Sequence, residues 1–179
     1  NHDTEDAVRK VSLLYLDELA GRRVQVVENN LSRSIEDTRV AVNLMTDEDK
    51  SDIEHLQDYQ ARMKKLYKLD KFAFVDTNGR IYTALGMQDN ISDYEFDYKS
   101  LSEPEIDILN IESADKKVVI AIPVDIPFNG ETLKVCFMEK DMVEMLAGVS
   151  MQSGDEDTTF CNIYTQDGVA LSNTILGGL

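Results

Sequence analysis

The first forty-five residues constrain the fold most, because they predict a helix far longer than an average globular helix. Residues 5–45 contain no proline and one glycine, Gly21. With Thr38 between Ile35 and Val42, apolar residues recur every three to four positions and form one stripe on a helix: Ala20, Val24, Val27, Leu31, Ile35, Val42 and Met45. A continuous helix over this stretch would be a rod of about 60 Å. We therefore expect a helix that extends beyond the rest of its own domain.

Composition and charge place the chain among globular proteins that do not bind nucleic acid. The chain has 179 residues, of which 42% are hydrophobic and 29% are charged, and this is enough for one domain with a core. Its formal net charge of −16 repels phosphate backbones. No apolar run is long enough to span a membrane, and no signal peptide is present. The chain starts without methionine and stops just after a strand-like run, so we expect a piece of a larger protein.

A second helix is predicted over residues 47–69. Thr46 is the expected N-cap, because acidic residues follow it in the first turn and lysines occupy the last turns. The expected apolar face consists of Ile53, Leu56, Tyr59, Met63 and Leu66. His55 lies off this face, and we interpret it as a solvated surface residue.

From Lys71 onward the pattern changes from helical to extended. Six strand-like runs are joined in pairs by Asx-Gly turns at 78–79, 129–130 and 167–168: 72–76 with 80–84, 118–122 with 133–138, and 161–164 with 169–172. Residues 141–147 are expected to form a short helix that Gly148 ends. The sequence predicts an α+β fold with one antiparallel sheet of about five to six strands, preceded by the two helices. Residues 1–70 would hold the helices and residues 71–179 the sheet, in one structural unit.

Residues 87–113 are the least regular part of the chain. They contain eight carboxylates and one base, Lys99, and they interleave the aromatic residues Tyr94, Phe96 and Tyr98. A long connection between two hairpins is often functional. The alternative is a segment whose aromatic side chains pack on the sheet while its acids face water, and the sequence leaves both interpretations open.

The residues of catalytic and metal sites are not grouped in this sequence, so we expect no enzymatic activity, no cofactor and no metal. The chain has two histidines, His2 and His55, which are too few for a catalytic triad or a zinc site at these spacings. No glycine-rich phosphate loop is present. Residues 76–79 superficially look like a calcium loop, but Phe74 stands where an oxygen ligand is needed. Cys136 and Cys161 lie in separate strand candidates, and buried free thiols are favoured over a disulfide.

The succession of these motifs resembles the Cache family, whose extracytoplasmic sensor domains have a PAS-like sheet. Residues 72–81 look like the first hairpin of that family, and residues 89–99 are similar to the acidic-aromatic stretch that follows it. Residues 119–124, with Pro123, resemble the next strand. Residues 129–146 and 163–169 resemble the later strand with its short helix and the closing hairpin. The resemblance covers essentially the whole chain, including the long helix at its start.

The resemblance implies a ligand-sensing domain of a bacterial transmembrane receptor, located outside the cytoplasm. Membrane segments flanking the chain would carry the signal to a histidine kinase, a diguanylate cyclase or a chemoreceptor module, and the first helix would act as the lever. The implied ligand-binding residues are Tyr82, Tyr94, Phe96, Tyr98, Ile120, Pro123 and Glu139. A homodimer through the first helix is also implied.

The ligand class follows from one substitution and from the charge. Amino-acid-binding members of the family carry an arginine where this chain has Tyr94 or Glu95, so the usual grip on a carboxylate is missing. Glu139 takes the approximate place of a later acid that would meet an amine. The acidic segment favours a cationic or neutral small molecule over a dicarboxylate.

Two alternatives remain open at the level of the sequence. One is a dimerisation or interaction domain that holds no ligand, and the other is a cytoplasmic PAS-like regulatory domain. Apolar spans in the flanking sequence would decide between the extracytoplasmic and cytoplasmic interpretations. A change of stability with ligand would exclude the ligand-free domain.

Overall fold

A computed structural model describes residues 4–11 and 24–145, and these residues have the α+β architecture that the sequence predicts. Helix α2 spans Val24–Asn43 and α3 spans Ile53–Tyr67. The strands are β1 (Lys71–Asp76), β2 (Ile81–Thr83), β3 (Gly86–Gln88), β4 (Glu105–Leu109), β5 (Lys117–Phe128) and β6 (Glu131–Asp141). They form one open sheet in the order β3-β2-β1-β6-β5-β4. None of the described helices is long and apolar enough to cross a membrane.

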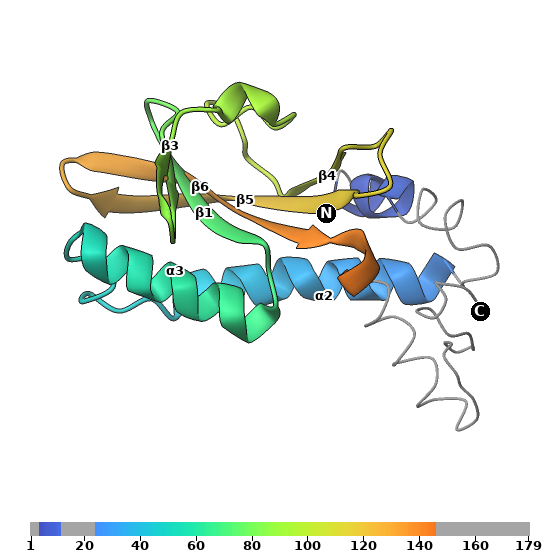
Figure 1. The fold of residues 1–179 in the computed structure, drawn as a ribbon, viewed down its shortest axis with the longest axis horizontal. Coiled ribbons are helices and arrows are strands. Elements are labelled where there is room, and N and C mark those ends of the chain that lie inside the picture. The colour runs from blue at the N-terminus through green and yellow to red at the C-terminus, as the bar shows by residue number, and fades with distance from the viewer. Residues whose placement is uncertain (1–3, 12–23, 146–179) are drawn as a thin grey trace. The chain divides into compact units, whose positions relative to one another are not determined.

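Residues 35–140 form one compact unit that contains the end of α2, helix α3 and nearly all of the sheet. In this unit α3 and the last turns of α2 cover one face of the sheet, which we call the helix face (Figure 1). The segment between β3 and β4, which includes a short 3-10 helix at Ile91–Asp93, crosses the opposite face. We call residues 89–101 the covering segment and the sheet surface beneath it the covered face. The other described residues belong to a second unit.

The long first helix differs from the expectation of one straight rod. Residues 4–11 are helical and α2 begins at Val24, while the residues between them lie outside the described part of the chain. The guanidinium of Arg9 lies 3.1 Å from the carboxylate of Glu28. In one continuous helix, Cα atoms 19 residues apart would be about 28 Å apart. The two helical pieces therefore lie side by side, and Val8 and Val11 are buried instead of facing water.

Helix α3 begins six residues later than the sequence predicts. Asp52 is its N-cap, and the Asp52 side chain accepts a hydrogen bond from the backbone N–H of His55. Thr46, the predicted cap, instead exchanges two hydrogen bonds with Asp49 in a turn before the helix. This reciprocal pairing is that of a capping box, but no helix follows it directly. His55 lies on the surface, as predicted.

The two described Asx-Gly turns join antiparallel neighbours, as the sequence predicts. Residues 78–79 connect β1 to β2, and residues 129–130 connect β5 to β6. Asn129 and Gly130 have φ values of 52° and 81°. Both values are positive, as a type I′ hairpin turn requires, and asparagine and glycine tolerate this region best.

Three strand expectations need correction or fall outside the described residues. Strands β3 and β4 were not expected, because they lie in the segment that the sequence marks as irregular. Their presence brings the sheet to six strands without the predicted hairpin at 161–172, which lies outside the described residues together with Cys161. Of the short helix predicted at 141–147, residues 142–145 are helical, whereas Asp141 still belongs to β6 and its carboxylate accepts from the N–H of Val143. Residues 146–148, with the predicted end at Gly148, lie outside the described residues.

The helix face is packed with aromatic side chains from α3 and β1. The ring of Tyr59 lies 5.7 Å from that of Phe72 and 6.4 Å from that of Phe74. The Tyr59 hydroxyl also donates to the backbone carbonyl of Ala41 at 2.6 Å and ties α3 to the end of α2. Leu66, predicted on the same apolar row, is 64% exposed. A residue on the apolar side of a helix is buried only where another element packs against it. Leu66 lies in the last turn of α3 and is exposed to water.

The glycines of the two turns allow a matched prediction. A Cβ on Gly79 would lie 2.8 Å from the Tyr98 hydroxyl oxygen, whereas a Cβ on Gly130 would meet no atom within 4 Å. Both residues have positive φ, near 80°. We expect Gly130→Ala to cost about 1 kcal/mol of unfolding free energy from backbone strain alone, and Gly79→Ala to cost about 1 kcal/mol more.

Urea denaturation of both variants measures this difference. Adding Tyr98→Ala to each variant is the control, because it removes the ring that an alanine at position 79 would strike. The Tyr98 contact has no part in the cost if the gap between the two glycine variants is unchanged in that background.

Candidate functional site

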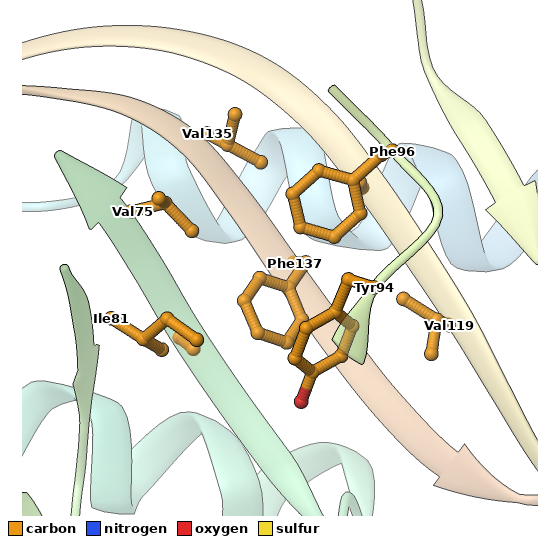
Figure 2. Packing of buried hydrophobic residues seen from close by; sticks show 9 residues of the cluster. Val75, Ile81, Tyr94, Phe96, Val119, Val135 and Phe137 are labelled. Carbon is orange, nitrogen blue, oxygen red and sulfur yellow. The ribbon is translucent and has the colours of Figure 1, made fainter. Parts of the chain in front are cut away.

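The candidate site lies on the covered face, where the covering segment places aromatic side chains over the sheet. Tyr94 and Phe96 point down onto Phe137 of β6, with ring centroids 4.7 Å and 5.4 Å from the Phe137 ring (Figure 2). The sheet side of this cluster consists of Ala73, Val75, Ile81, Val119, Ala121, Val135 and Phe137. Neighbouring acids of the segment, such as Asp93 and Glu95, face water. Of the two interpretations of this segment, its packing on the sheet is therefore confirmed.

A buried polar group adjoins the aromatic cluster, and we call Lys71, Gln88, Tyr94 and Glu139 the polar cluster. The register pairs Lys71 of β1 with Glu139 of β6, so both side chains lie on the covered face. The Lys71 ammonium lies 3.0 Å from the Tyr94 hydroxyl, 3.2 Å from the amide oxygen of Gln88 and 3.4 Å from the Glu139 carboxylate. These three contacts match the three donors of a lysine.

The Tyr94 hydroxyl completes the cluster by donating a hydrogen bond to the Glu139 carboxylate. Burial, and then this hydrogen bond, raises the pKa of Tyr94 above the usual range of tyrosine, so the hydroxyl keeps its proton. The carboxylate of Glu139 is thus held by one cation and one neutral donor. Glu139 is only 7% exposed, and these two contacts offset the cost of burying its charge.

A groove with a volume of about 510 Å³ lies between the covering segment and the edge strand β4. Its lining includes Asn90, Asp93, Tyr94, Glu95, Ile108 and Leu109. We call it the β4 groove. With Ile111, it combines three aliphatic residues and one aromatic ring with two carboxylates, and its volume is in the range of small-molecule sites.

Acidic residues line the β4 groove and lie near it. Burial, followed by the nearby carboxylates of Asp107, Glu95 and Asp97, raises the pKa of Glu105 on β4. Burial is the main cause of this raised pKa, and the carboxylates add to it. The groove itself is lined by the carboxylates of Asp93 and Glu95, whose charge a bound cation would offset. The groove is therefore suited to cationic or neutral molecules.

The structure brings some of the seven residues implied by the family resemblance together and separates others. Tyr94, Phe96 and Glu139 meet on the covered face, and Tyr94 alone among the seven also lines the β4 groove. Tyr98 is half-buried beside this cluster and lies over the Gly79 turn.

The remaining three residues lie elsewhere. Tyr82 pairs with Phe74 in the register and faces the helices, where its hydroxyl donates to Asp76 at 2.8 Å. Burial and this hydrogen bond raise the pKa of Tyr82 to about 12. Ile120 alternates with the covered-face residues Val119 and Ala121 and is fully buried. Pro123 lines a different groove, next to the end of α2.

Sequence reasoning missed two members of the polar cluster, Lys71 and Gln88. Lys71 immediately precedes the aromatic run that predicts β1, and a lysine at a strand edge is normally read as solvated. Only the strand register could have shown its position, because the register places Lys71 opposite Glu139. The amine that Glu139 was expected to meet is therefore supplied by the chain itself.

Among residues 4–11 and 24–145, no group of three or more His, Cys, Asp or Glu side chains could hold a metal ion. His55 contacts Asp52 and Glu48 on the surface. Those carboxylates raise the pKa of His55, with the Asp52 hydrogen bond as the main cause. Cys136 is buried as a free thiol, and burial raises its pKa, which makes it a poor nucleophile.

Comparisons with known proteins returned no family model, no curated protein and no solved structure that matches this chain.

Proposed function

We propose that this chain is the ligand-sensing domain of a transmembrane signal-transduction receptor, similar to the Cache family and located outside the cytoplasm. The observation that carries the proposal is the β4 groove, a space of small-molecule size between the covering segment and the edge strand β4. The strand order supports it, since the hairpins β1–β2 and β5–β6 meet through β1 and β6 in the centre of the sheet. In the Cache family, a PAS-like sheet binds its small molecule on one of its faces.

The ligand in this proposal is a small cationic or neutral molecule that binds the β4 groove. Asp93 and Glu95 would hold an ammonium or hydroxyl group, and the Tyr94 ring with Ile108 would contact its apolar part. Glu139 is not the primary contact, because Lys71 already pairs with it. Binding would act on signalling by favouring one position of the covering segment over another. The output would be a histidine kinase, a diguanylate cyclase or a chemoreceptor module.

One observation favours the alternative of a ligand-free dimerisation or interaction domain. Directly beneath the covering segment, the space over Phe137 is filled by Tyr94 and Phe96 (Figure 2). The covered face is thus packed by its own side chains, and beside it the β4 groove stays open to a small molecule. The two functions differ in whether a small molecule changes the stability of the domain.

A thermal-shift screen over amines, polyols and organic acids tests the proposal. We expect an amine or a neutral polyol, at about ten times its Kd, to raise the melting temperature by roughly 3–6 °C. Glu95→Gln should reduce that shift, because it removes one carboxylate from the groove. The matched control is Glu112→Gln, an exposed acid outside the groove, which should leave the shift unchanged.

Two outcomes would count against the proposal. Stabilisation by dicarboxylates alone would exclude the cationic or neutral ligand class. The absence of any shift across the screen, together with a dimer in light scattering, would favour the ligand-free domain.

A further inference from the structure

A second groove, separate from the β4 groove, lies along the half of β5 that does not pair with β4. Pairing between β4 and β5 ends at Glu105 and Ala121, although β5 continues to Phe128. Alongside this part of β5 runs a groove of about 480 Å³, whose other wall is the end of α2 and the turn that follows it. We call it the β5 groove.

Prolines prevent the exposed edge of β5 from accepting another strand. Pro123 and Pro127 are four residues apart, so their backbone nitrogens face the same edge. A proline is tolerated within a sheet where its missing N–H faces away from the paired neighbour, which is β6. Both nitrogens therefore face the free edge of β5, where Pro123 also lines the β5 groove, and an added strand would lack two of its hydrogen bonds. The groove is better suited to a small molecule than to an extended peptide.

The wall formed by the end of α2 is held in place before any ligand arrives. The Tyr59 hydroxyl binds the carbonyl of Ala41, and the Thr46–Asp49 pair closes the following turn with two hydrogen bonds. Arg62 adds an ion pair to Asp49 at 2.9 Å. These contacts position Lys50, the next residue along the chain, so a ligand would bind without the cost of ordering this turn.

The floor of the β5 groove is apolar and its rim carries a net positive charge. Four side chains form the floor: Val42, Met45, Ile122 and Ile126. The rim holds Arg39, Lys50 and Asp125. Lys50 is half-buried and makes no ion pair within residues 4–11 and 24–145. Arg39 pairs with Glu36 three residues away, in an exposed contact of little strength.

We propose that the β5 groove binds an amphipathic monocarboxylate, an aliphatic chain that ends in one carboxylate. The aliphatic chain lies on the floor, and the carboxylate is held by the Lys50 ammonium with the Arg39 guanidinium beside it. Asp125 limits the charge of the ligand to one, since a second carboxylate would be repelled. This site and its ligand class are independent of the β4 groove and of the sensor function proposed above.

Titration with octanoate, followed by two-dimensional NMR, tests the proposal. We expect saturable shifts at Val42 and Ile126, with octan-1-ol and octylammonium binding at least roughly fivefold more weakly. Lys50→Gln should weaken octanoate binding by roughly threefold to tenfold, and Asp125→Asn should strengthen it. Lys65→Gln, which removes an exposed lysine of α3 outside the groove, is the matched control and should change nothing.

The opposite effects of Lys50→Gln and Asp125→Asn keep the test informative even if one variant is less stable. Equal binding of octanoate and octylammonium would overturn the proposal, and so would shifts confined to other residues. Weakening by Lys65→Gln to the same extent, or no saturation at millimolar octanoate, would also refute it. Binding of an acidic peptide in place of octanoate would assign the groove to a protein partner instead.

Discussion

Replacing Asp76 with alanine is expected to lower the free energy of unfolding by about 3–4 kcal/mol. Asp76 ends β1, is 2% exposed, and accepts three hydrogen bonds. Its carboxylate binds the backbone N–H groups of Asn78 and Arg80 and the hydroxyl of Tyr82, at 2.8–3.1 Å. Alanine would leave the Tyr82 hydroxyl without a partner in the core and would release the turn that joins β1 to β2. Urea denaturation at neutral pH measures the loss.

Asp97 is the matched control for Asp76. It also accepts a backbone N–H two residues ahead, from Lys99, and a hydroxyl, from Ser100. Asp97 is fully exposed, so water replaces the lost acceptor and Asp97→Ala should change stability little. Asp76→Asn should fall between wild type and Asp76→Ala, because the amide keeps one acceptor oxygen. Similar losses for Asp76→Ala and Asp97→Ala would show that burial of these hydrogen bonds is unimportant.

Replacing Lys71 with methionine is expected to cost about 2–3 kcal/mol, the second-largest effect. Methionine keeps most of the apolar stem but removes the ammonium that contacts Gln88, Tyr94 and Glu139. The Glu139 carboxylate then stays buried with only the Tyr94 hydroxyl to hold its charge. Leaving a buried charge without a partner destabilises a fold by more free energy than the intact ion pair contributed to it.

A double variant and a matched lysine separate this effect from simple loss of packing. Adding Glu139→Gln to Lys71→Met should restore about 1 kcal/mol, because the unpaired charge disappears. Lys117→Met is the control: its side chain is 22% exposed, close to the 20% of Lys71, but its partners Asp70 and Asp115 are 45% and 68% exposed. An exposed pair contributes little, so that variant should lose less than about 1 kcal/mol. Equal losses for the two lysine variants would contradict the role of buried charge.

Local rules account for the elements that the sequence predicted well. Asn129-Gly130 favours a hairpin because few other residue pairs adopt positive φ at both positions at low cost, and the first turn needs positive φ at Gly79 alone. The aromatic and β-branched runs of β1, β5 and β6 are likewise recognisable without knowledge of their neighbours.

Strand β4 shows why other elements were missed. Ile106 and Ile108 alternate with acidic residues, which is the period of a half-buried strand, but the high charge of the region concealed it. The start of α3 was misplaced for a related reason. Thr46 and Asp49 form the hydrogen bonds expected of a helix start, and only the structure shows that they close a turn instead.

The candidate sites depend on contacts between residues far apart in the sequence. The sequence marked Tyr94, Phe96 and Glu139, but it could not show that Lys71 would supply the amine. The β5 groove depends on where β4 stops pairing with β5, which no local pattern records. The Arg9–Glu28 contact likewise shows two helical pieces side by side where the sequence predicted one rod.

The sequence by itself determined the α+β class, the Asx-Gly hairpins and the acidic-aromatic segment, because turn geometry and side-chain period act within a few residues. Tertiary structure alone decided which face each strand residue occupies and which charges meet. Strand register has a period of two, so a shift of one residue would exchange the covered face and the helix face. The helix that opened the sequence is governed in the same way: its apolar stripe predicted helical residues, and burial of Val8 and Val11 decided where they lie.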